Sequence, residues 1–250
     1  MLAAEWIKIK SVRSTVLTLV FMVVLGVGIS ALGALAVHAA VSHHRIGPGF
    51  DPVARSLGGM LIAQIAIGVL GVLVFSAEVA SGTISQTFAA VPKRWHVLLA
   101  KVLVYFVIAL VASEVVSVAS FLVGQAVMHG VVPTTSLTNA TAMRAVLGTG
   151  LLVAIVGVLA LAIGVMIRRT AGAITTFVGE YLVLPLLVTA LPSPYSTDIE
   201  KFLPFQAAQV MMSSQLVANS LSAWVGLAVV AGYAVIAVVV AGSLLSSRDA

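Results

Sequence analysis

Residues 145–167 read AVLGTGLLVAIVGVLALAIGVMI, an uncharged run bounded by Arg144 on one side and by Arg168 and Arg169 on the other. A helical residue rises about 1.5 Å, so about 20 apolar residues cross the hydrocarbon core of a bilayer. Barrel strands are shorter and alternate in polarity, whereas this run is continuously apolar. It therefore predicts a membrane-spanning helix, in which the backbone polar groups are satisfied internally.

The composition of the whole chain agrees with that prediction. Of the 250 residues, 61% are hydrophobic and only 8% are charged, whereas soluble domains carry about 25% charged residues. So few charges cannot cover a water-soluble core, which excludes a soluble enzyme, a nucleic-acid-binding domain and a disordered protein. The absence of cysteine from the sequence excludes disulfides, thiolate metal sites and cysteine nucleophiles.

The intervals between charged residues predict six such helices in one all-α integral membrane domain, residues 1–250. The six predicted spans are 16–38, 57–77, 98–123, 145–167, 171–191 and 221–243.

The distribution of Lys and Arg predicts the orientation. With the N-terminus inside, nine of the 13 cations fall on the cytoplasmic side: Lys8, Lys10, Arg13, Lys93, Arg94, Lys101, Arg168, Arg169 and Arg248. The other four fall outside: Arg45, Arg55, Arg144 and Lys201. Cytoplasmic loops carry the excess of positive charge, so both termini are expected in the cytoplasm.

The N-terminal residues 1–14 predict an interfacial helix. Trp6 favours the headgroup level, and Lys8, Lys10 and Arg13 supply cations for the membrane surface. Leu2, Trp6 and Ile9 recur at helical spacing and form an apolar stripe. The stripe is imperfect, because Glu5 and Arg13 border it. The alternative is a charged start that only orients the first span.

A short cytoplasmic helix is predicted at 83–91, between the second and third spans. Gly82 can end the preceding span, and Thr83 with Gln86 matches a capping box, which satisfies the free amides of a helix start. Pro92 stops the helix.

The same helix has an apolar face. Ile84, Phe88 and Val91 recur at helical spacing. Lys93 and Arg94 follow at the carboxyl end, where cations are favoured by the helix dipole. The segment therefore predicts an amphipathic helix at the cytoplasmic surface.

The residues 192–220 predict an outer helical loop. Pro192, Pro194 and Pro204 punctuate it, and an apolar run follows that is too short to span. That run would be a re-entrant or interface-lying helix, or an ordinary loop helix packed on the bundle.

Two acidic residues fall inside predicted spans, Glu114 in the third and Glu180 in the fifth. A charge at the bilayer centre is costly, so such carboxyls face a cavity or a partner. Ser113, Ser117 and Ser120 form a polar stripe beside Glu114. These groups are predicted either to line a pathway, where they would recognise a cationic group, or to hydrogen-bond between helices.

The loop between the second and third spans resembles the signature loop of ABC-2 type transporter permeases. The matching residues are Glu78, Gly82, Thr83, Pro92, Arg94 and Lys101. The opening residues 5–14 look like the N-terminus of actinobacterial members of that family.

The resemblance implies a type V ABC exporter fold. Residues 1–14 would be the connecting helix, 83–91 the coupling helix that docks on an ATPase, and 192–220 the external helices. Two permease copies, identical or different, would pair in the bilayer above two ATPase subunits.

The resemblance also implies which residues would contact the ATPase. Ile84 and Phe88 would insert into a groove of the ATPase, while Glu78, Lys93 and Arg94 would set polar contacts at its rim.

No G-x-x-x-x-G-K-[ST] motif occurs in the sequence, so the chain has no P-loop with which to bind ATP. ATP and Mg²⁺ would be bound by the partner ATPase. We expect no catalytic residue, metal site or cofactor in this chain, and no nucleic-acid partner.

The predicted function is that of the permease subunit of an ATP-driven exporter in the bacterial plasma (inner) membrane. It would move a hydrophobic or amphipathic compound outward, such as an antibiotic, an antimicrobial peptide or a lipid-like molecule. One alternative is a membrane scaffold or sensor that does not transport. Another is a proton-coupled secondary transporter using Glu114 or Glu180, which an inverted repeat would support; none is evident.

Overall fold

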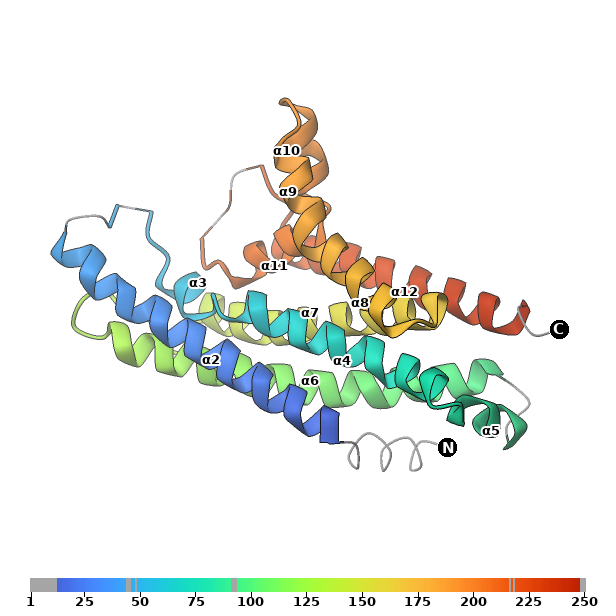
Figure 1. Cartoon of the computed structure of the whole chain (residues 1–250). Helices are drawn as coiled ribbons and strands as arrows, with labels where there is room; N and C mark the ends of the chain where they lie inside the picture. Colours follow the sequence, from blue (N-terminus) through green and yellow to red (C-terminus); the bar gives the residue numbers. More distant parts are fainter. Residues whose placement is uncertain are drawn as a thin grey trace.

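The computed structural model describes residues 13–43, 46–47, 49–90, 94–215, 217 and 219–247, and this part of the chain forms helices and loops without strands. Within it, six helices are long and apolar enough to cross a membrane (Figure 1). They are α2 (Arg13–Ser42), α4 (Met60–Ala80), α6 (Arg94–Met128), α7 (Ala140–Ile167), the run α8–η1–α9 (Thr170–Val178, Gly179–Val183, Leu184–Thr189) and α12 (Ala223–Ser247). The shorter helices are α3 (Pro52–Ser56), α5 (Thr83–Ala90), α10 (Tyr195–Glu200) and α11 (Pro204–Met212).

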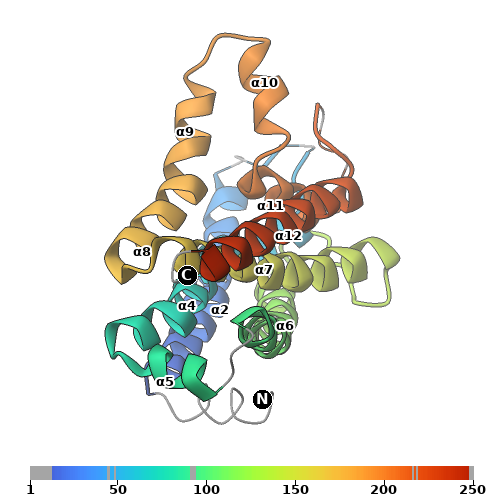
Figure 2. The ribbon, with the colours of Figure 1, turned by 90° about the vertical axis from the view of Figure 1, so that its right-hand side faces the viewer.

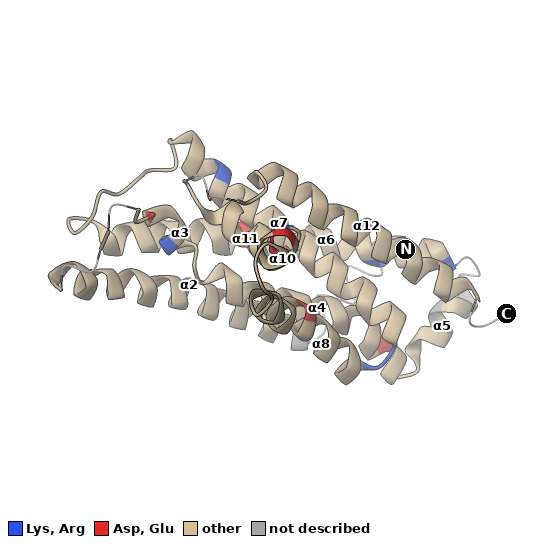
Figure 3. Ribbon diagram, turned by 90° about the horizontal axis from the view of Figure 1, so that it is seen from above, with Lys and Arg blue, Asp and Glu red and all other residues tan. Residues whose placement is uncertain are grey.

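The helices α2 and α6 are longer than the predicted spans 16–38 and 98–123, because the apolar interval sets only the length that lipid requires. The start of α2 and the end of α12 lie at the same end of the bundle as α5, which we call the inner end (Figure 1). The opposite end, with α3, is the outer end. Long stretches of α2 and α12 carry no charge (Figure 3).

The helix α7 lies at the centre of the bundle, in contact with α4, α6, α8, α11 and α12 (Figure 2). In the most apolar stretch of α7, 78% of the residues are buried, whereas in the corresponding stretch of α2 only 28% are buried. Helices in lipid gain little from the hydrophobic effect when they associate, so close van der Waals packing must hold them together. The small residues of α7 allow that packing.

One aromatic side chain shows how close the packing is. Tyr105 of α6 is fully buried, and its hydroxyl donates a 2.7 Å hydrogen bond to the carbonyl of Ile67 in α4. A Cβ on Gly157 of α7 would lie 2.4 Å from that hydroxyl, and a Cβ on Gly71 of α4 would lie 3.0 Å from it. The two glycines therefore leave the space that the ring of Tyr105 occupies between three helices.

Hydroxyl groups add polar links between α6 and α7. Ser113 donates to the carbonyl of Gly150 and Ser117 donates to that of Val146, both at 2.7 Å. Both serines are buried. Of the two roles predicted for Ser117, the structure shows the interhelical hydrogen bond.

The fifth span is interrupted by a π-helical turn, η1, followed by Pro185 in the first turn of α9. Proline has no amide hydrogen to donate to the preceding turn, which favours a local change of helical geometry there. Within η1, Tyr181 is buried and its hydroxyl donates a 2.5 Å hydrogen bond to Gln64 of α4. Beyond η1 the chain leans away from the other spans, towards α10 (Figures 1 and 2).

At the outer end, the carboxylate of Asp51 joins α3 to the residues that follow α11. It caps the first turn of α3 and also accepts hydrogen bonds from the Ser213 hydroxyl (2.9 Å), the Ser214 hydroxyl (2.8 Å) and the Ser214 amide (2.6 Å). Arg144 of α7 donates to the carbonyl of Ser213 at 2.6 Å. The residues after α11 are thus tied to α3 and α7, and α11 packs on α7 and α12.

These hydrogen bonds determine the ionisation of Asp51. Burial alone would raise the pKa of its carboxyl, but the bonds from Ala54, Ser214 and Ser213 outweigh burial and leave the pKa below its ordinary value. The charged form is therefore favoured by folding.

We predict that Asp51→Asn destabilises the protein by roughly 1–2 kcal/mol at neutral pH, because an amide nitrogen replaces one charged acceptor. A lowered folded-state pKa gives stability that is present above the ordinary pKa of the carboxyl and is lost as the pH falls through the folded value. Thermal unfolding in detergent between pH 6 and pH 3 should therefore show a steeper acid loss in the wild type than in Asp51→Asn. Parallel pH profiles would contradict this role.

We also predict that Gly71→Ala destabilises the bundle by roughly 1–3 kcal/mol through overpacking. The new Cβ would lie 2.4 Å from the backbone oxygen of Gly157, which has little room to move. Gly28→Ala is the matched control, because a Cβ there has no neighbour within 4 Å. Thermal unfolding should separate the two variants, and equal melting temperatures would show that α4 and α7 can part at no cost.

Candidate functional site

The helix α5 lies at the inner end and connects α4 to α6. The helix α4 ends at Ala80, and Gly82 turns the chain with a φ of +74°, a left-handed conformation that glycine adopts without strain. The hydroxyl of Thr83 lies 2.9 Å from that of Ser81 and donates to the carbonyl of Glu78 at 3.4 Å. These local bonds position the start of α5 against the end of α4.

The apolar face of α5 is turned towards the bundle of its own chain. Ile84 and Phe88 are half-buried and pack against the hydrophobic core. Ser85 and Gln86 are exposed, and Ser85 also borders a cavity beneath α5 together with Ile84 and Phe88. The packing of Ile84 and Phe88 removes part of their apolar surface from water, and their predicted insertion into an ATPase groove stays a prediction.

A cavity of about 380 Å³ lies beneath α5. Its walls come from α4, α5, α12 and the inner ends of α6 and α7, and include Phe75, Ile84, Phe88, Arg168 and Leu245. The apolar face of α5 thus borders a cavity, so the small helix has room to shift against the larger ones.

Arg94, in the first turn of α6, connects three of these elements. Its Nη1 donates to the carbonyl of Leu245 in α12 at 3.0 Å, and its guanidinium carbon lies 5.3 Å from the ring centroid of Phe88 in α5. A guanidinium over an aromatic face is attracted by the ring quadrupole. Arg94, predicted at the rim of a partner contact, is therefore directed into the chain's own inner end.

Glu78 and Lys101 form an ion pair between α4 and α6. The Lys101 Nζ lies 2.6 Å from Glu78 Oε1, and the Lys101 side chain is only 1% exposed. Lysine is rarely buried unless it is paired, so this bond fixes the register of the two helices that flank α5. The carboxylate of Glu78 is thus paired within the chain, and its predicted contact with a partner stays a prediction.

Several of the predicted residues lie outside the part of the chain that the structure describes. These are Trp6, Lys8 and Lys10 of the interfacial helix, and Val91, Pro92 and Lys93 at the end of the coupling segment. Arg13 begins α2, with its side chain also outside that part. Their predicted roles stay predictions.

Within the membrane-spanning region, Glu114 lies on α6 against α7. A Cβ on Gly150 would meet its carboxyl carbon at 2.5 Å, so the absence of a side chain at Gly150 makes space for that carboxyl. Glu180 is half-buried in the π turn η1. The structure therefore places the two acids on different helices, α6 and η1.

Some of the residues at the inner end were not singled out from the sequence. Leu245 accepts the Arg94 bond through its backbone carbonyl, and Arg168 lines the cavity after ending α7 in a left-handed conformation. A carbonyl acceptor leaves no signal in a sequence. Positive φ is uncommon for residues other than glycine, so the C-cap at Arg168 could not be predicted either.

The arrangement defines a class: a multi-pass helical membrane protein whose second and third spans are joined by a short inner surface helix. The family model for the ABC-2 family transporter proteins matches residues 1–183, well over half of the chain. The chain belongs to this ABC-2 transporter family. No match was found among curated proteins.

Family membership identifies the chain as a transport permease of the membrane, a subunit that is not itself catalytic and that works with an ATPase subunit. The matched residues include α5, Arg94 and the Glu78–Lys101 pair, and they end within η1. The inner end described above therefore lies in the part of the chain that the family shares.

We predict that Lys101→Met costs roughly 3–5 kcal/mol, because it leaves Glu78 in a mostly buried position without its cation. The double variant Glu78→Gln/Lys101→Met should recover most of that loss. Unfolding in detergent gives the three free energies of the cycle. The control is Lys201→Met, which removes a cation from an exposed pair with Asp198 and should change stability by less than about 1 kcal/mol. A double variant as unstable as Lys101→Met would contradict the pairing.

Proposed function

We propose that this chain is the membrane subunit of an ATP-driven exporter, and that its separate ATPase docks on the exposed face of α5. The placement of α5 carries the proposal. It is a surface helix on which Gln86 is exposed, while Ile84 and Phe88 pack against the bundle and Phe88 lies against Arg94 of α6.

The contacts of α5 suggest how a push from outside would be transmitted. If closure of the ATPase displaces α5, Phe88 displaces the guanidinium of Arg94, which is bonded to Leu245 at the end of α12. The Glu78–Lys101 pair makes the ends of α4 and α6 move together. Packed helices shift between discrete arrangements, so a displacement at the inner end would reorient whole spans.

A second permease copy would pack against the run α8–η1–α9. Leu186 and Leu187 of α9 are 70% and 60% exposed, and this run leans away from the other spans (Figure 2). A partner helix would cover these leucines with close packing. The two copies, identical or different, would enclose the pathway, and each would bind one ATPase subunit that holds ATP and Mg²⁺.

The cargo in this proposal is hydrophobic or amphipathic, because the spans offer apolar surface with few charged groups. In a bacterial plasma membrane, with the inner end in the cytoplasm, transport would be outward. Antibiotics, antimicrobial peptides and lipid-like molecules fit that chemistry.

Two substitutions in α5 separate docking from transmission. Gln86→Arg places a long cation on the exposed face and should lower copurification of the ATPase about tenfold, as a loss of about 1.4 kcal/mol implies. Phe88→Ala should leave copurification intact but strongly reduce ATP-dependent transport, because the contact with Arg94 is lost. Thr134→Arg, at an exposed outer position, is the control and should behave as wild type.

The outcomes are distinct. A folded Gln86→Arg variant that retains the ATPase would place the docking surface elsewhere. A stable complex whose ATPase never responds to a transported compound would indicate a scaffold or sensor, and flux driven by a pH gradient without ATP would indicate a secondary transporter.

A further inference from the structure

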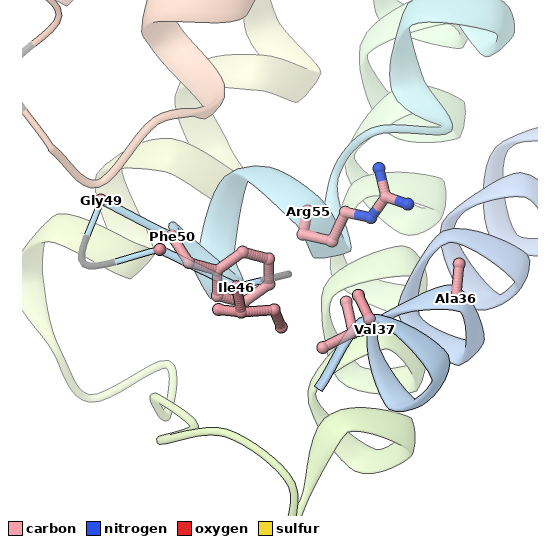
Figure 4. A pocket seen from close by; sticks show the side chains of 8 residues that line it. Ala36, Val37, Ile46, Gly49, Phe50 and Arg55 are labelled. Atoms are coloured by element: carbon pink, nitrogen blue, oxygen red, sulfur yellow. The ribbon is translucent and has the colours of Figure 1, made fainter. Parts of the chain in front are cut away.

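The outer end contains a cavity of about 480 Å³ between α2 and the loop that follows it (Figure 4). Ala36, Val37 and Ala40 of α2 form one side, and Ile46 and Phe50 of the loop form the other. Arg55 of α3 lines the cavity as well, and it is the one charged residue among the described residues that do so.

The cavity exists because α2 continues beyond the start of α4. The amide of Gly59, just before α4, is hydrogen-bonded to the hydroxyl of Ser30. From there α2 continues to Ser42, and the loop returns along it. A small hydrophobic cluster of Ala34, Val37 and Met128, with Ile46 and Phe50 against it, holds the loop near α2.

Arg55 is held in place by one of its nitrogens. Its Nε donates a 2.9 Å hydrogen bond to the carbonyl of Gly33 in α2. A Cβ on Gly33 would lie 3.3 Å from that Nε, so the glycine lets the guanidinium lie against the helix backbone. Asp51, the acidic residue nearest to Arg55 in the sequence, accepts hydrogen bonds from Ser213 and Ser214.

The two terminal nitrogens of Arg55 make no hydrogen bond or ion pair with any residue that the structure describes. The side chain is exposed, and arginine keeps its charge at any physiological pH. Its fixed position thus presents two aligned donors, the arrangement that binds phosphate and carboxylate oxygens.

The position of Arg55 indicates where the ligand comes from. The membrane-spanning helix α4 begins at Met60, directly after α3, and from this position we infer that the guanidinium lies near the outer headgroups. A free inorganic anion needs donors on several sides, whereas the other side chains that line the cavity are alkyl or aromatic. An anion with an attached apolar part fits both features.

We propose that this cavity binds the phosphate of an anionic phospholipid from the outer leaflet. Arg55 holds the phosphate, and the cavity walls formed by Val37, Ile46 and Phe50 contact the apolar part next to the headgroup. The bound lipid bridges α2 and the loop that leads into α3.

The test uses the full chain in phosphatidylcholine bilayers that contain a minor fraction of phosphatidylglycerol with a photoreactive group beside the headgroup. Crosslinked peptides should map to residues 36–50 in the wild type. Arg55→Gln should lower that labelling about tenfold or more, as expected for the loss of a charge-assisted contact. Lys201→Gln removes another outer cation and should leave the labelling unchanged.

A second pair of variants keeps the arginine. Ala36→Phe fills the cavity and should also abolish labelling, whereas Ala39→Phe, one exposed position that does not line it, should not. This pair tests whether the lipid occupies the cavity even if Arg55→Gln fails to fold.

Three results would overturn the proposal. Labelling that survives both Arg55→Gln and Ala36→Phe would show that the cavity is not the site. Phosphatidylcholine carries the same phosphate, but its choline cation neutralises the net charge. Equal labelling by photoreactive phosphatidylcholine would therefore show that the net negative charge of the lipid is not recognised. Displacement by inorganic phosphate in solution would identify a site for a free anion instead, whereas labelling that resists phosphate supports the lipid.

Discussion

The close approach of neighbouring helices to α7 is the constraint on which the rest of the structure depends. In lipid, apolar side chains gain little by leaving the solvent, so helices stay together through contact distance and internal hydrogen bonds. Gly157 brings α7 near enough for Tyr105 to span the space to α4. Ser113 and Ser117 bond α6 to the carbonyls of the same helix. Because α7 also contacts α11 and α12, a change in its position would displace helices on most sides of the bundle.

The two ends of the bundle differ in how they are held. At the outer end, Asp51 accepts several short hydrogen bonds from two segments far apart in the sequence, which ties α3 to the residues after α11. At the inner end, α5 borders a cavity and is held by a cation–π contact and by apolar side chains.

Much of the fold follows from the sequence because its determinants are local. A mostly apolar run of sufficient length must be helical in a bilayer, so the six spans could be located from the order of apolar and charged residues alone. Gly82 likewise separates α4 from α5, since it acts on its own backbone. The exact ends were less predictable: α2 and α6 extend beyond the predicted spans 16–38 and 98–123, and the end of α2 packs against Met128 of α6 through Ala34 and Val37.

The candidate site was predicted only in part. The sequence identified Glu78, Lys101, Arg94 and the apolar face of α5, because family spacing and helical periodicity are both visible in one dimension. It could not show which way that face turns.

An amphipathic helix at a membrane surface can direct its apolar side towards a partner or towards its own chain, and the two cases have the same periodicity. What decided between them is tertiary: Phe88 lies against Arg94, which is bonded to a carbonyl on the last span. The sequence by itself determined that this chain is a six-helix membrane permease with a short inner helix. Only the tertiary structure decided what that helix contacts, because contacts between residues so distant in the chain depend on how the spans pack.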